Sequence, residues 1–189
     1  MNRQEKQRIC PVEYAGGLDH SLRSLLQNPQ KILKPYIHKG MSVLDLGCGP
    51  GFFSVEMAKM LEDSGKVIAA DLQKGMLDKV ISKIKGTELE QRIIIHKCGE
   101  QEIGLNEKVD FILAFYMVHE VPDKERLFEE FKSILNPNGK IYIIEPKFHV
   151  SKKQFEDMIN KITGHGFEIL ARPKVFFSRT ALFTSTNLQ

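Results

Sequence analysis

The feature that most constrains the fold is a regular alternation of two kinds of segment from residue 42 onward. One kind is rich in Val, Ile, Leu or Phe with little polar alternation, which is typical of strands buried on both faces. We predict strands at Ser42–Leu46, Lys66–Asp71, Arg92–Lys97, Val109–Phe115 and Lys140–Glu145. The other kind carries apolar residues at helical spacing, and we predict helices at Phe52–Leu61, Gly75–Lys85 and Lys124–Leu135. This alternation predicts right-handed crossovers and an α/β fold with a single doubly wound, mostly parallel sheet.

The N-terminal part of the chain precedes this alternation and reads differently. Leu18–Leu26 and Pro29–Ile37 are predicted to be short helices, and Asn28 is placed to cap the second of them. Residues 1–40 would then form a helical cap that belongs to the same domain as residues 41–189.

The C-terminal part is predicted to add one helix and two strands. Asn136–Gly139 is a run of turn residues that should end the helix before it. A helix is predicted at Lys152–His165, followed by strands at Phe167–Ala171 and Thr180–Thr184. Because the loop between these two strands is short, we expect them to pair antiparallel at one edge of the sheet.

Composition sets limits on the class of protein. At 189 residues and 42% hydrophobic, the chain can form one domain with a full core. It has no apolar run near the roughly 18–20 residues that cross a bilayer, and no signal-peptide segment follows the charged Met1–Ile9. Three widely spaced cysteines suggest no disulfide framework. We therefore expect a soluble, cytoplasmic protein. The net charge of +3 comes from interspersed signs, so nucleic acid is not the expected partner.

The most informative segment is Val43–Gly51, which runs from a predicted strand through three glycines into a predicted helix. Glycines at such a turn let a ligand lie against the main chain. The spacing is G-x-G-x-G rather than the G-x-G-x-x-G of the dinucleotide fingerprint. Asp45, two residues before the first glycine, would repel a pyrophosphate and suits a ligand that carries cationic groups.

A second carboxylate is placed for a ribose. Asp71 ends the second predicted strand, 20 residues after Gly51, where dinucleotide folds put the acceptor of the ribose hydroxyls. A carboxylate only accepts hydrogen bonds, so it can take both hydroxyls of an unphosphorylated ribose.

These residues resemble the class I S-adenosylmethionine-dependent methyltransferases. Val43–Gly51 looks like the first motif of that family, Ile68–Asp71 resembles the second, and Gln73–Leu77 is similar to the segment that leads into the next helix. The resemblance is strongest over residues 36–145 and is close to the branch of ubiquinone and menaquinone C-methyltransferases. It implies a Rossmann-like sheet of seven strands, with an antiparallel strand next to one edge.

The resemblance also implies a set of cofactor contacts. The glycine loop would lie by the methionine part of the cofactor, Asp71 would hold the ribose, and Leu72 would pack on the adenine. Glu100 departs from the Asp-Ala or Asn-Ala pair of most relatives at the adenine edge. The implied cofactor-binding residues are Asp45, Gly47, Cys48, Gly49, Gly51, Asp71, Leu72, Met76, Gly99, Glu100, Gln101 and Phe115.

The candidate catalytic residues are Tyr116 and His119, which follow the fourth predicted strand. Methyl transfer from a sulfonium depends largely on positioning, and a general base is needed only if the acceptor loses a proton. His119 is the natural base candidate, and the alternative is that it bonds a loop carbonyl and shapes the pocket. The candidate substrate-contacting residues are Tyr14, Arg23, Glu120, Glu145 and His149. The first two belong to a segment that would fold over the cofactor as a lid or simply cover a sheet face.

Two further ligand hypotheses follow from the polar side chains. His119, Glu120, Glu145 and His149 could converge on zinc or iron, but they have no metal-ligand spacing, so a polar substrate pocket is the preferred interpretation and no metal is predicted. The cysteines at positions 10, 48 and 98 would suggest an arsenite methyltransferase if they met, which nothing in the sequence indicates.

The function that these observations favour is methyl transfer from S-adenosylmethionine to a small-molecule acceptor, with S-adenosylhomocysteine as product. One alternative is a non-catalytic partner or regulator that binds the same cofactor, because binding motif and chemistry occupy different residues. A lesser one is an NAD-dependent oxidoreductase, which the glycine spacing disfavours. The chain has Ala114–Met117 where nucleic-acid amino-methyltransferases carry an Asn/Asp-Pro-Pro-aromatic turn. The oligomeric state stays open.

Overall fold

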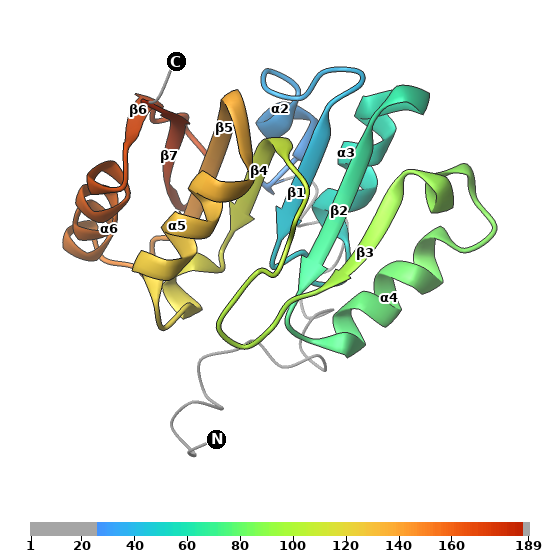
Figure 1. Cartoon of the computed structure of the whole chain (residues 1–189), viewed down its shortest axis with the longest axis horizontal. Coiled ribbons are helices and arrows are strands. Elements are labelled where there is room, and N and C mark those ends of the chain that lie inside the picture. The colour runs from blue at the N-terminus through green and yellow to red at the C-terminus, as the bar shows by residue number, and fades with distance from the viewer. Residues whose placement is uncertain (1–25, 187–189) are drawn as a thin grey trace.

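The fold is a seven-stranded sheet in the order β3-β2-β1-β4-β5-β7-β6 (Figure 1). The structure is a computed structural model and describes residues 26–186. The strands are β1 (Ser42–Leu46), β2 (Lys66–Asp71), β3 (Ile93–Lys97), β4 (Val109–Phe115), β5 (Leu135–Pro146), β6 (Phe167–Ala171) and β7 (Ser178–Ser185). The first five strands along the chain, β1 through β5, run parallel to their neighbours among one another, whereas β7 is antiparallel to both β5 and β6. The predicted fold class is confirmed, including the antiparallel C-terminal pair.

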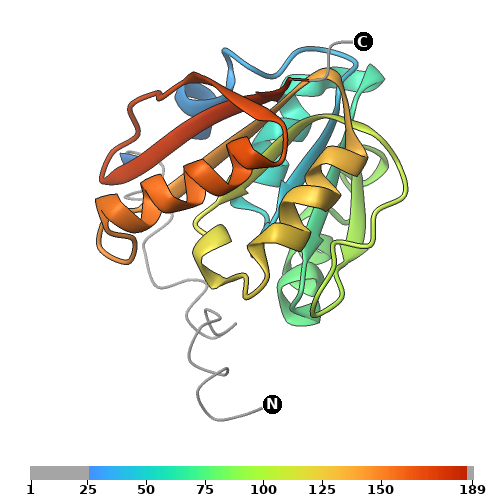
Figure 2. The same ribbon diagram turned by 60° about the vertical axis from the view of Figure 1, so that its left-hand side comes forward.

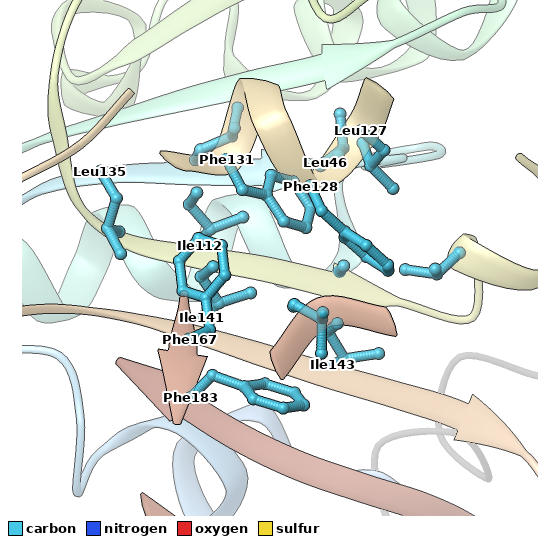
Figure 3. Close-up of a cluster of buried hydrophobic side chains, with 14 of the residues drawn as sticks. Leu46, Ile112, Leu127, Phe128, Phe131, Leu135, Ile141, Ile143, Phe167 and Phe183 are labelled. Atoms are coloured by element: carbon cyan, nitrogen blue, oxygen red, sulfur yellow. The ribbon is translucent and has the colours of Figure 1, made fainter. Parts of the chain in front are cut away.

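Helices cover both faces of the sheet (Figure 2). The helices are α2 (Pro29–Leu33), α3 (Phe52–Leu61), α4 (Lys74–Ile84), α5 (Lys124–Ile134) and α6 (Lys152–Gly164). Apolar side chains of α2, α3 and α4 pack on one face, and those of α5 and α6 pack on the other. The second of these two cores is built around Phe128 and Phe131 of α5, which are fully buried (Figure 3).

The strand order sets where a ligand can bind. The chain passes from β1 outward to β3 on one side and then returns to place β4 on the other side of β1. Such a reversal opens a crevice outside the carboxyl ends of the two strands that flank it. Those carboxyl ends point to the lower side of the sheet in Figure 1. The glycine loop after β1 and the segment after β4 therefore meet at one edge.

Several element boundaries differ from the sequence prediction, those of β3, α4, α5, α6 and β7 by one or two residues and two others by more. The second N-terminal helix ends at Leu33 rather than Ile37, because Pro35 has no N–H to continue the hydrogen-bond ladder. Asn28 does cap this helix, and its side chain accepts from the N–H of Lys31 at 3.1 Å. The helix predicted at 18–26 lies, apart from its last residue, outside the described residues.

The turn predicted at residues 136–139 is instead the irregular start of β5. The Asn136 side chain donates to Asp110 of β4 at 2.7 Å, which draws this stretch alongside the neighbouring strand. The β4–β5 register shifts between Val109 and Phe111, and Asn138 has a positive φ of 63°.

Across residues 26–186, none of the helices combines the length and apolar character that a membrane span requires.

Candidate functional site

The glycine loop follows β1 directly and has left-handed backbone at all three glycines. Their φ angles are 69° at Gly47, 54° at Gly49 and 80° at Gly51, which disfavours any residue with a Cβ. A Cβ at Gly47 would lie 2.8 Å from the Cβ of Met117, so this position also needs glycine for packing. A Cβ at Gly49 would meet nothing within 4 Å. The loop thus leaves open space beside its backbone at Gly49.

Asp71 ties this loop to the next βα turn. Its carboxylate accepts from the N–H of Gly49 at 2.9 Å and from the N–H of Gln73 at 2.7 Å. Burial raises the pKa of the Asp71 carboxyl, although these two hydrogen bonds act in the opposite direction. Each carboxylate oxygen can accept a second hydrogen bond, so the side chain still has capacity for hydroxyl donors.

Asp45 is placed beneath the loop. Only 2% of it is exposed, and its carboxylate accepts from the hydroxyl of Ser54 in α3 at 2.5 Å. Ser54 was not among the predicted site residues, although a serine at the third position of the helix after a glycine loop is a signal that points to it. This contact makes Asp45 a link between β1 and α3.

The residues expected around the adenine lie on either side of this turn. Leu72 is half-buried and Met76 is buried. Phe115 is buried and its ring centroid lies 4.4 Å from that of Phe53. After β3, the residues Gly99, Glu100 and Gln101 are all exposed.

The described cysteines are free and buried. Burial raises the pKa of the Cys48 thiol well above its usual range and that of Cys98 to about 12. The raised pKa values disfavour the free thiolate, which is the form that binds metals and metalloids. The third residue of the arsenite hypothesis, Cys10, lies outside the described residues, as do Tyr14 and Arg23.

On the other side of the crevice, His119 is held by Glu145. The Nδ1 of His119 lies 2.5 Å from a carboxylate oxygen of Glu145, and the other oxygen accepts from the backbone N–H of His119 at 3.2 Å. Glu145 is the last residue but one of β5 and is 1% exposed. Because a carboxylate accepts, Nδ1–H of His119 is the donor in this bond, and Nε2 is the ring nitrogen that Glu145 leaves available. Glu145 was predicted to touch substrate, and its two oxygens instead engage His119.

The other two predicted members of this cluster are also brought to His119. An oxygen of Glu120 lies 4.0 Å from Nε2 of His119, and the His149 ring stacks on the His119 ring at 5.7 Å. Burial lowers the pKa of His119, but the hydrogen bond and charge of Glu145 outweigh it and raise that pKa. Within residues 26–186, no group of three His, Cys, Asp or Glu side chains is arranged to hold a metal.

Tyr116 directly follows β4 and precedes the short segment that carries His119. It has a left-handed φ of 59°, which is rare for an aromatic residue and is typical of functional sites. Its hydroxyl accepts from Gln27 at 2.9 Å and lies 2.7 Å from the hydroxyl of Ser178. Its ring centroid lies 4.2 Å from that of Phe115. The backbone and two hydroxyl contacts thus fix the ring beside the cluster around His119.

The Glu120 carboxyl gives a pH-dependent prediction. Burial raises its pKa from 4.5 to about 7. The folded state therefore binds this proton more tightly than the unfolded state, and stability is lost as the pH rises from about 4.5 to about 7. Glu120→Gln should remove that loss and raise the free energy of unfolding by about 2–3 kcal/mol at pH 8, with little difference at pH 4.5. Urea denaturation at the two pH values measures this, and an equal effect at both would contradict the assignment.

Fold and site together define a class of protein. A glycine loop after β1, an acid at the end of β2 and an aromatic residue after β4 lie at the carboxyl ends of neighbouring parallel strands of a doubly wound sheet. Residues 37–171 match the family described as "Methyltransferase domain". The chain therefore belongs to this family, within the class I S-adenosylmethionine-dependent methyltransferases, and the predicted class and cofactor are confirmed.

Relatives with sequence or structural similarity agree with this assignment. The chain is 30% identical over 110 residues to a demethylmenaquinone methyltransferase of Lactobacillus johnsonii, which covers 58% of this chain and 45% of the relative. It is 25% identical to a ubiquinone/menaquinone biosynthesis C-methyltransferase of Cronobacter sakazakii, over 72% of this chain and 53% of the relative. The chain thus spans about half the length of the curated relatives it matches.

Among solved structures, a SAM-dependent methyltransferase from Aquifex aeolicus superposes with a TM-score of 0.79. The two chains are 27% identical, and the match covers 93% of this chain and 100% of that one. A putative S-adenosylmethionine-dependent methyltransferase of Methanococcus maripaludis gives a TM-score of 0.74 at 19% identity, over 94% of each chain, which shows a shared fold.

The residues present fit the cofactor of this class. A Cβ at Gly49 would occupy the open space beside the loop. Glycine at this position therefore leaves the main chain accessible to a ligand. The Asp71 carboxylate beside Gly49 has remaining acceptor capacity, as a ribose requires. No chemical conflict arises, since Asp45 is turned to Ser54 and adds an acid near the loop that suits a ligand with cationic groups.

Proposed function

We propose that this chain transfers a methyl group from S-adenosylmethionine to a small-molecule acceptor, with His119 as general base. The observation that carries the proposal is the pairing of His119 with the buried Glu145. This pair stands across the crevice from the glycine loop, beside Tyr116. A histidine oriented by a buried carboxylate is an arrangement suited to taking a proton at a defined atom.

The cofactor side of the crevice would be formed by the glycine loop and its partners. Asp71 would accept from the ribose hydroxyls, Gly49 would leave its backbone to the methionine part, and Leu72 would pack on the adenine. S-adenosylmethionine, when bound, supplies a methyl group on a sulfonium, which is already reactive. The chain's own contribution on this side is to fix the position and orientation of the ligand.

The acceptor side would be formed by Tyr116, His119 and Glu120. Glu145 keeps the proton on Nδ1 of His119, so that Nε2 can accept the proton that an acceptor atom loses. The charge of Glu145 then stabilises the imidazolium that forms. Tyr116 would wall the crevice between the two ligands, and its fixed ring would orient a flat acceptor.

The curated relatives are named for quinone substrates. Because this chain spans only about half of their length, their substrates are a starting point for it rather than an assignment. A small aromatic molecule with an ionisable hydroxyl is the first acceptor class to test, since it would stack on Tyr116 and give a proton to His119.

His119→Ala should separate binding from catalysis. We expect the affinity for S-adenosylmethionine to stay within about twofold, and turnover to fall by about 10²–10⁴, the usual contribution of a general base. Formation of S-adenosylhomocysteine with a panel of hydroxylated aromatic acceptors measures this, and exposed His38→Ala is the matched control.

Two outcomes would count against the proposal. Unchanged turnover in His119→Ala would make His119 a residue that only shapes the pocket. Cofactor binding by the wild type with no S-adenosylhomocysteine formed from any acceptor would favour a non-catalytic cofactor-binding protein.

A further inference from the structure

Three phenylalanines lie exposed on two neighbouring loops. Phe148 follows β5 and is 68% exposed, and Phe176 and Phe177 precede β7 and are 54% and 60% exposed. The backbone N–H of Lys147 donates to the carbonyl of Phe177 at 3.0 Å, which joins the two loops. Large apolar side chains gathered in this way are typical of interaction surfaces.

Basic residues accompany these rings. We name Lys147, Phe148, Lys174, Phe176 and Phe177 together the basic aromatic face. A groove of about 700 Å³ adjoins it and contains further cations. The charged residues that line the groove are Lys147, Lys152, Arg172, Lys174, Arg179 and Glu156.

The groove carries a clear excess of positive charge. Glu156 supplies the negative charge among the described residues that line it, and both of its oxygens bind Arg172, at 2.6 and 2.8 Å. Lys152 and Arg179 also act electrostatically on this one carboxylate, so five basic residues of the groove face a single acid. A chain with a net charge of only +3 has thus gathered cations around its most exposed apolar rings.

The basic aromatic face borders the acceptor side of the crevice. The Phe148 ring centroid lies 4.8 Å from that of His149 and 6.4 Å from that of Tyr116. Ser178, next to Phe177, contacts the Tyr116 hydroxyl. Whatever binds this face therefore lies next to the place where an acceptor would enter.

We propose that the basic aromatic face docks the protein on a membrane surface that contains anionic phospholipids. The phenyl rings would enter the boundary between head groups and acyl chains, and the lysines would meet the lipid phosphates. Stable attachment needs two such signals, an apolar group and a basic patch, and both are present here. The rings carry no hydrogen-bonding group, which suits insertion among acyl chains. This docking goes beyond methyl transfer and does not depend on it.

Sedimentation with lipid vesicles tests the proposal. The protein should bind phosphatidylcholine vesicles that contain about a quarter phosphatidylglycerol, and should stay in solution with phosphatidylcholine alone. Lys147→Glu/Lys174→Glu and Phe176→Ala/Phe177→Ala should each lower the partition coefficient on the order of tenfold or more. The matched control is Lys85→Glu/Lys132→Glu, which makes the same charge change near the C-terminal ends of α4 and α5. These positions lie toward the amino ends of the parallel strands, away from the basic aromatic face. The control should bind nearly as the wild type does.

Three results would overturn the proposal. Equal loss in the control would show a general charge effect, and binding that survives both face variants would place the contact elsewhere. Displacement of the protein from vesicles by a single-stranded RNA that binds it more tightly than the vesicles do would make this a nucleic-acid surface. Calorimetry with S-adenosylmethionine on the same variants checks that they are folded. Loss of cofactor binding in the wild type would count against the cofactor site and not against the docking surface.

Discussion

Replacing Asp71 by Ala is expected to weaken binding of S-adenosylmethionine by at least about a hundredfold. The carboxylate sits at the end of β2, accepts from the N–H of Gly49 and has capacity left for ribose hydroxyls. The variant loses the contacts to the ribose hydroxyls. It also loses the carboxylate that ties Gly49 of the glycine loop to Gln73 of the next turn. Hydrogen bonds to a charged group contribute about 1.5–3 kcal/mol each, and about 2.7 kcal/mol already corresponds to a hundredfold.

Isothermal calorimetry measures this effect, and two further variants sharpen it. Asp78→Ala removes an exposed acid from α4 that pairs with Lys74, and should leave the affinity unchanged. Asp71→Asn keeps the shape and one acceptor oxygen, so its loss should be intermediate. Affinity in Asp71→Ala equal to that of the wild type would remove Asp71 from the cofactor site.

Glu145→Gln is expected to lower turnover by about 10-fold to 100-fold while the affinity for the cofactor stays the same. This prediction rests on the proposed base role of His119. The amide keeps the size of the side chain but loses the charge that raises the pKa of His119. The acidic limb of the pH–rate profile should therefore move to lower pH in the variant. A side chain that only fills space would leave this limb in place.

Glu129→Gln on the exposed side of α5 is the control for this substitution. It should change neither the rate nor the profile. If Glu145→Gln lost turnover without any movement of the acidic limb, Glu145 would support the local fold and would not set the protonation of His119.

Much of the fold could be predicted because its strands are nearly continuous apolar runs. β1, β2 and β4 have the predicted bounds, since strands covered by helices on both faces are nearly continuous in apolar residues. β6 also has the predicted bounds, although it is an edge strand with most of its residues exposed. The two larger boundary differences depend on particular side chains. Pro35 ends α2 early, and the contact of Asn136 with Asp110 turns a predicted turn into the start of β5.

The candidate site could be predicted in its positions but not in its pairings. The glycine spacing and Asp71 indicated a ligand crevice after β1 and β2, and the polar residues after β4 and β5 do converge around His119. The bond between His119 and Glu145 spans 26 residues and depends on how β4 and β5 align. The packing of Gly47 against Met117 depends on two loops in the same way. Such contacts come from tertiary register, which local sequence patterns do not carry.

The measurement that tests the central claim most directly is calorimetry of the purified protein with S-adenosylmethionine, S-adenosylhomocysteine and NAD. The arrangement of the glycine loop and Asp71 predicts micromolar binding of both adenosyl sulfur compounds and no heat with NAD. Binding of NAD alone would contradict the account, because it would mean that the crevice accepts a pyrophosphate at the loop where Asp45 adds an acid.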